Sequence, residues 1–226
     1  MNANGQTSTA LEDKLAPKPS NLTFEQAAVL AISGSTALQA VRDHGKVRRG
    51  QKVLIIGASG GVGTYAVQIA KAFGAHVTGV CSTKKAEMVR TIGADRVIDY
   101  TREDFAEGEH RYDVILDTGG NSSLARLRHV LAPKGTLIIV GGEGGGKWLG
   151  GIDRQLRATM LSPFVGQKLG TFINTENHEY MLVLKDLIES GKVTPVIDRT
   201  YPLAEVPEAI RYMESGHAQG KVVITI

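Results

Sequence analysis

The chain is poor in residues that build covalent or metal-bound frameworks. Its 226 residues include a single cysteine, Cys81. One cysteine cannot form a disulfide within the chain, and it excludes a zinc cluster built from cysteines. The six histidines are scattered without the spacing of metal ligands. The sequence therefore predicts no metal site, and Cys81, at the end of an apolar run, is interpreted as a small buried hydrophobic residue.

Long apolar runs and strongly charged blocks are also missing. No run reaches the length of a membrane-spanning helix, and the first twenty residues lack the apolar core of a signal peptide. Lys and Arg number 26 against 23 Asp and Glu, and no basic block of the kind that follows a phosphate backbone occurs. We therefore expect a cytoplasmic protein that has neither a membrane nor a nucleic acid as its partner.

The remaining chain alternates between apolar strands and helices. Residues 1–20 are polar, end in APKPS, and are interpreted as a tail or remnant linker, so that 21–226 would form one domain. Two short helices broken near Ser33 and Gly34, with Thr23 and Gly45 as caps, are expected first. Strands are predicted over 52–57, 76–81, 95–100, 112–117, 136–141, 159–166 and 220–226, and helices over 61–73, 84–92, 122–131, 178–190 and 204–215. This order predicts an α/β fold, a doubly wound parallel sheet (Rossmann fold) with helices on both faces.

A glycine-rich turn follows the first of these strands. The sequence VLIIGASGGVG runs from a buried strand directly into a helix, which is the context of a dinucleotide-binding turn. Gly60 is placed for close approach of the backbone to a pyrophosphate, and Gly63 for close packing of helix on strand. Ala58 stands where the usual pattern has its first glycine, and Gly57 precedes it. The turn predicts that a dinucleotide binds at the N-terminus of the helix.

The end of the second strand indicates which dinucleotide. A site that prefers NAD usually carries an acidic residue there, whereas this chain has CSTKK at 81–85. Ser82 can hydrogen-bond a 2′-phosphate, and Lys84 or Lys85 can neutralise its charge. The alternative is that the lysines are a solvated helix start, although lysine in a first turn opposes the helix dipole. The pattern favours NADP(H), and the missing acid argues against a methyltransferase, which would need one for the ribose.

Several blocks in the same order resemble one family. GASGGVG with AVQIAKAFGA, GVCSTKK, IGADRVIDY, YDVILDTGG, PKGTLIIVGG and the closing GKVVI resemble the zinc-independent quinone oxidoreductase branch of the medium-chain dehydrogenases/reductases. The resemblance runs from about Lys14 to the last residue. It implies reduction of quinones or α,β-unsaturated carbonyls by NADPH without a metal.

The resemblance also implies which residues contact the cofactor. The pyrophosphate would meet Ser59, Gly60, Gly61 and Val62, and the adenosine 2′-phosphate end would meet Ser82, Lys85 and Tyr100. Further contacts are implied for Asn121 near the adenine side or the ribose, for Val140 and Gly141 at the nicotinamide ribose, and for Phe164 and Val165 at the nicotinamide, with Lys221 nearby. From the residues alone, Tyr100 could equally be a strand-end aromatic, and Val140 and Phe164 could be plain packing residues.

Members of this family carry an N-terminal, mostly β domain that supplies much of the substrate cleft. Here ALEDKLAPKP resembles only its last residues. Two functions stay open: an NADPH-dependent oxidoreductase acting on a small-molecule substrate, and a catalytically inactive NADPH-binding fragment or nucleotide-sensing module. No catalytic residue can be assigned. We expect a homodimer formed through the 159–166 strand, which would cover apolar surface and unpaired backbone groups.

Overall fold

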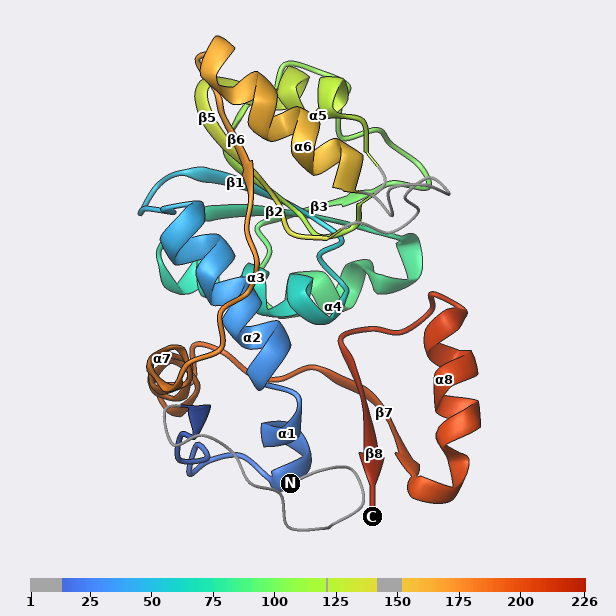
Figure 1. Cartoon of the computed structure of the whole chain (residues 1–226). Helices are drawn as coiled ribbons and strands as arrows, with labels where there is room; N and C mark the ends of the chain where they lie inside the picture. The colour runs from blue at the N-terminus through green and yellow to red at the C-terminus, as the bar shows by residue number, and fades with distance from the viewer. Residues whose placement is uncertain (1–13, 121, 142–151) are drawn as a thin grey trace.

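The computed structural model describes residues 14–120, 122–141 and 152–226 (Figure 1). Its centre is a six-stranded sheet in the order β3-β2-β1-β4-β5-β6, and every neighbouring pair is parallel. The strands are β1 (Lys52–Ile56), β2 (His76–Cys81), β3 (Arg96–Asp99), β4 (Tyr112–Asp117), β5 (Leu131–Ile139) and β6 (Lys168–Thr171). This strand order is that of the doubly wound dinucleotide-binding fold, so the predicted fold class is confirmed.

Both faces of the sheet are buried, and β1 shows how its sequence achieves this. Val53 and Ile55 belong to one hydrophobic cluster, whereas Leu54 and Ile56 belong to a second. Successive side chains of a strand point to opposite faces, so an uninterrupted apolar run fills two cores at once. A strand of this kind needs helices on both sides.

Helices supply the two covers. The first cluster receives side chains from α2 (Ala31–Leu38), α3 (Gly61–Ala72), α4 (Ala86–Thr91) and α7 (His178–Glu189). The second receives them from α5 (Leu124–Val130) and α6 (Ile152–Leu161). Figure 1 shows α5 and α6 on one side of the sheet, with α2, α3 and α4 on the other. A short 3₁₀ turn, Thr83–Lys85, leads into α4.

The N-terminal helices differ from the prediction in where they break. Thr23 caps α1 (Phe24–Ala28) in a capping box with Gln26, as its sequence predicts. The break follows at Val29 and Leu30, and Ser33 and Gly34 lie inside α2. A Cβ at Gly34 would stand 3.1 Å from Leu184 of α7. The glycine therefore serves close helix packing, which is why reading it as a helix end was wrong. Directly after α2 the chain continues as a π-helix from Gln39 to His44, and Gly45 is its C-cap residue.

The predicted strand over 159–166 is also wrong. Most of this segment is the end of α6 and a 3₁₀ turn, Ser162–Phe164, whose Pro163 cannot donate to a strand ladder. Ala158 is buried between sheet and helix while Leu156 and Met160 are exposed, a helical pattern. The actual strand, β6, comes later and consists of KLGT, a short sequence with little strand propensity.

The C-terminal strands form a unit beside the main sheet. β7 (Ile197–Pro202), which the sequence analysis missed, pairs in parallel with β8 (Lys221–Thr225), and α8 (Val206–Glu214) connects them after a 3₁₀ turn, Leu203–Glu205. The predicted closing strand thus exists, but it does not extend the six-stranded sheet (Figure 1). Gly220, just before β8, donates its N–H to the carbonyl of Ser59 at 2.8 Å, which joins this unit to the glycine-rich turn.

Candidate functional site

A cavity of about 1120 Å³ lies at the carboxyl ends of the strands. Its walls come from the turns after β1, β2, β3, β4 and β5 and from the segment leading into β8. In an open α/β sheet this end is where ligands bind, because strand order reverses there. The predicted residues that line the cavity are Ser59, Gly60, Gly61, Val62, Lys85, Tyr100, Val140 and Gly141.

The glycine-rich turn brings bare backbone to the cavity. Gly57 takes a positive φ of 80°, which allows the chain to reverse directly after β1. A Cβ at Gly63 would lie 2.1 Å from the carbonyl oxygen of Gly57, so only glycine lets α3 approach the strand this closely. The predicted packing role of Gly63 is confirmed. Gly60 is the N-cap residue of α3, and no side chain of the described residues caps the helix there. The first N–H groups of α3 are thereby left for an anion.

A lysine from the far end of the chain stands beside this helix terminus. Lys221 places its Cδ 3.1 Å from a Cβ built at Gly61, and its Nζ lies 3.3 Å from the hydroxyl of Ser33 in α2. Burial lowers the pKa of Lys221, and within the described ranges no carboxylate forms an ion pair with it. A half-buried ammonium and a helix N-terminus together attract negative charge.

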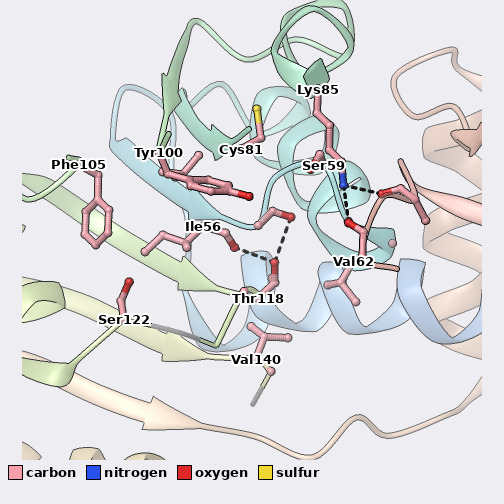
Figure 2. Close-up of a pocket in the computed structure, with 18 of the residues that line it drawn as sticks. Ile56, Ser59, Val62, Cys81, Lys85, Tyr100, Phe105, Thr118, Ser122 and Val140 are labelled. Atoms are coloured by element: carbon pink, nitrogen blue, oxygen red, sulfur yellow. Dashed lines mark hydrogen bonds between the residues drawn. The ribbon is translucent and has the colours of Figure 1, made fainter. Parts of the chain in front are cut away.

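At the end of β2 the two candidate lysines separate. Lys85 lines the cavity and donates hydrogen bonds from Nζ to the carbonyls of Gly216 and Ala218 at 3.1 and 2.8 Å (Figure 2). Lys84 is exposed and lies outside the lining. Tyr100 follows β3 and is 63% exposed, with its ring over the cavity. Lys85 therefore brings an ammonium group to this end of the cavity, and Tyr100 brings an aromatic ring.

Cys81 ends β2 against the same cavity. It is buried, as predicted, and burial together with the nearby Asp99 raises the pKa of its thiol to about 11. A thiol with so high a pKa stays protonated at neutral pH and is a poor nucleophile.

The opposite wall is formed by the turns after β4 and β5. The hydroxyl of Thr118 donates to the carbonyl of Ile56 at 2.7 Å, which ties the turn after β4 to the glycine turn (Figure 2). Val140 and Gly141 donate their N–H groups to the carbonyl of Asp117 at 2.9 and 3.3 Å. Both walls therefore rest on hydrogen bonds between backbone segments and hold a defined width.

Three predicted residues do not line the cavity, and a fourth lies outside the described residues. Ser82 precedes the 3₁₀ turn at the end of β2, outside the lining. Phe164 is 84% exposed in the turn after α6, and Val165 packs partly against the second hydrophobic cluster. Asn121 lies outside the described residues.

Sequence reasoning missed part of the lining. Ser33 reaches the cavity from α2, Thr118 from the turn after β4, and Phe105 and Arg126 from the side beyond β3. The DTGG motif after β4 was a usable signal, because a polar residue at a strand end faces this edge of the sheet. Ser33 carried no such signal, since only the packing of α2 on α3 brings it near.

The described residues do not supply a metal site. In residues 14–120, 122–141 and 152–226, no group of three or more His, Cys, Asp or Glu side chains is placed to hold a metal ion. Within the same ranges, no helix is long and apolar enough to span a membrane.

Comparisons with known proteins agree with this geometry. The family model described as zinc-binding dehydrogenase matches residues 92–224. The mitochondrial NAD(P)H oxidoreductase RTN4IP1 of Mus musculus is 34% identical over 95% of this chain, and the chloroplastic NADPH-dependent alkenal/one oxidoreductase of Arabidopsis thaliana is 36% identical over 96%. The quinone oxidoreductase from Coxiella burnetii superposes with a TM-score of 0.81 at 28% identity, over 93% of this chain and 63% of that one. The chain spans 59% and 51% of the mouse and Arabidopsis proteins.

Proposed function

The chain belongs to the zinc-binding dehydrogenase family, and from this premise we propose that it is an NADPH-dependent oxidoreductase that transfers hydride to quinones or α,β-unsaturated carbonyls. One observation carries the proposal. The cavity joins an uncapped helix N-terminus to two lysines, Lys221 beside the glycine turn and Lys85 at the end of β2. A dinucleotide phosphate carries negative charge at both positions.

The cofactor is proposed to lie across the sheet edge. Its pyrophosphate would meet the backbone at Gly60, the N–H groups of Gly61 and Val62 and the ammonium of Lys221, and its 2′-phosphate would meet Lys85 and Tyr100. The nicotinamide half would then reach Val140 and Gly141. The fit is supported by the bare glycine backbone and by the absence of an acidic residue in the stretch CSTKK after β2. NADPH supplies the hydride, while the protein orients the ring and limits access of water.

Activity tests the proposal directly. Purified protein is mixed with NADPH and either a para-benzoquinone or a linear enone, and loss of reduced-nicotinamide absorbance is followed. We expect oxidation that depends on the acceptor and is slower with NADH, because NADH offers no 2′-phosphate to Lys85. Binding of NADPH without oxidation by any acceptor would contradict the catalytic part of the proposal.

A second function follows from the open side of the cavity. Tyr100 is 63% exposed although it lines the proposed adenosine site, so the described residues cover the ligand incompletely. A module that binds or senses NADPH without turnover needs no enclosed substrate cleft. Measurable turnover in the assay above would exclude it.

Self-association is proposed through β6, in place of the 159–166 strand. Among the described strands, β6 pairs only with β5 and forms an edge of the sheet. Leu156, Met160 and Phe164 lie at helical spacing on the neighbouring α6 and the turn after it, and all three are more than half exposed. An edge strand flanked by apolar side chains favours pairing with a second copy. A cytoplasmic location stays a prediction, since the names of similar proteins include mitochondrial and chloroplastic ones.

A further inference from the structure

A buried ion pair lies directly behind one wall of the cavity. Asp117 ends β4 and is 0% exposed, and Arg154 of α6 approaches its Oδ2 with Nη1 at 2.8 Å. The other carboxylate oxygen, Oδ1, accepts the N–H of Gly120 at 3.0 Å. Oδ2 makes no well-directed hydrogen bond within the described residues, so the attraction to Arg154 is its main compensation. An unpaired carboxylate would be costly at this depth.

Arg154 does more than neutralise Asp117. Its Nη1 also donates to the carbonyl of Ser122 at 2.8 Å, and Nη2 donates to the carbonyl of Gly141 at 3.2 Å. Ser122 follows β4 and Gly141 follows β5, and both line the cavity. The planar guanidinium thus fastens two cavity-lining turns to one carboxylate, which a single ammonium group cannot do with the same geometry.

Asp117 contributes to the same wall through its backbone. Its carbonyl accepts the N–H groups of Val140 and Gly141. Both Asp117 and Arg154 therefore hold the turn after β5 by hydrogen bonds. The side chains of this pair form no hydrogen bond or ion pair with the turns after β2 and β3 in the described structure. The hydrogen bonds of this pair therefore act on the turns after β4 and β5.

We propose that Arg154, anchored by Asp117, is a positioning residue for the nicotinamide half of the cofactor. This inference rests on the proposed function, which places that half against Val140 and Gly141. Arg154 does not line the cavity itself and is only 14% exposed at its side chain. It acts by fixing the carbonyls of Ser122 and Gly141, and so the width of the cavity at this end.

The test compares the whole cofactor with its adenosine half. Titration calorimetry measures the binding of NADPH and of adenosine 2′,5′-bisphosphate to wild type and to Arg154→Met. We expect the dissociation constant for NADPH to rise on the order of tenfold, the loss of roughly one charge-assisted hydrogen bond, with that for the bisphosphate unchanged. Arg154→Lys, which keeps the charge without the fork, restores only part of the affinity.

Two further variants keep the outcome interpretable. Arg157→Met changes an exposed arginine on the same helix and should bind both ligands like wild type. Because Arg154→Met leaves Asp117 unpaired and can impair folding, the double variant Asp117→Asn/Arg154→Met removes both charges. It should fold and show the same selective loss. Equal NADPH affinity in wild type and the folded double variant, or equal losses for both ligands, would overturn the inference. Failure of wild type to bind NADPH at all would instead overturn the proposed function.

Discussion

At the scale of single residues, Gly63 gives the sharpest prediction about the glycine turn. Replacing it with alanine puts a Cβ 2.1 Å from the carbonyl oxygen of Gly57 and 2.9 Å from backbone atoms of Ala58. Backbone cannot yield as a flexible side chain does, so α3 must move away from β1. We expect Gly63→Ala to lower the free energy of unfolding in urea by about 1–3 kcal/mol. Gly170→Ala, where nothing lies within 4 Å, is the matched control and should be near neutral.

Lys221 predicts how the free energy of unfolding depends on pH. Because burial lowers its pKa below 10.5 in the folded protein, the unfolded chain holds the proton more tightly. The contribution of Lys221 to the free energy of unfolding should therefore rise as pH increases through the lowered pKa toward 10.5. Lys221→Met should remove this rise without loss of stability at pH 7. Because other groups such as Cys81 also titrate in this range, the test is the difference between the two profiles, and identical profiles would contradict the assignment.

Lys221→Met also distinguishes the proposed pyrophosphate contact from the proposed 2′-phosphate contact. A pyrophosphate is common to NADPH and NADH, so Lys221→Met should weaken both by a similar factor, roughly tenfold. Lys85 is proposed to contact only the 2′-phosphate, and its replacement should affect NADPH alone. Calorimetric titrations of both variants with both cofactors measure the difference. If Lys221→Met weakened the binding of NADPH but left the binding of NADH unchanged, the placement of the pyrophosphate would be contradicted.

Much of the site was predictable from sequence because it sits where strands end. The glycine turn and Lys85 were predicted from the residues that follow two recognisable strands, whereas Tyr100, Val140 and Gly141 were implied by the family resemblance; all of them line the cavity. Arg154 and Ser33 were not predictable, because each reaches the site through helix packing between segments distant in sequence. Phe164 and Val165 were assigned by resemblance to a segment taken for a strand, and the structure places that segment in a helix end and a turn.

At the scale of elements, the errors in the predicted fold share one physical cause. Short apolar runs such as MLSPFV do not distinguish a strand from a buried helix. A glycine inside a helix, such as Gly34 in α2, is not distinguished by its residue type from a glycine that ends one. Long strands buried on both faces, such as β1, carried no such ambiguity. β6 and β7 were missed because an edge strand or a strand with an open face needs few apolar residues. Tertiary contacts decided these elements.

The segment before α1 is joined to α7 by Asn21, whose Nδ2 donates to the carbonyl of Ile188 at 3.0 Å, and by the carboxylate of Glu189, which predicts a local response to acid. Glu189 at the end of α7 accepts hydrogen bonds from the N–H and hydroxyl of Ser20 at 2.8 Å each. Lys185 and then Ser20 lower the pKa of Glu189 from 4.5 to about 2. A lowered pKa means that this stabilisation is complete above pH 4.5 and is lost as pH falls toward 2.

Hydrogen exchange of the amides near Ser20 measures this directly. After correction for intrinsic exchange, protection of this segment in wild type should decrease from pH 4.5 downward. In Glu189→Gln it should be low already at neutral pH and should change little with acid. Glu179→Gln, at the opposite end of α7, serves as the control and should behave like wild type. Equal protection in wild type and Glu189→Gln would contradict a role for this carboxylate.

At the scale of the whole molecule, the β6 edge and its apolar flank predict a dimer. Met160→Glu places a charge in the exposed stripe of Leu156, Met160 and Phe164. Light scattering at micromolar concentration should show a dimer for wild type and a monomer for the variant, because burying a carboxylate against apolar side chains is unfavourable. Ile210→Glu, at an exposed apolar position of α8, should remain dimeric. A wild-type monomer would contradict the proposed interface.

The central claim is that the cavity binds NADPH through a charge at its β2 end. The most direct measurement is a calorimetric titration of wild type, Lys85→Glu and Lys84→Glu with NADPH and NADH. We expect wild type to prefer NADPH, Lys85→Glu to lose that preference, and Lys84→Glu to keep it. The reason is that Lys85 lines the cavity and Lys84 does not. Equal affinity of wild type for the two cofactors, or a preference unaffected by Lys85→Glu, would contradict the claim.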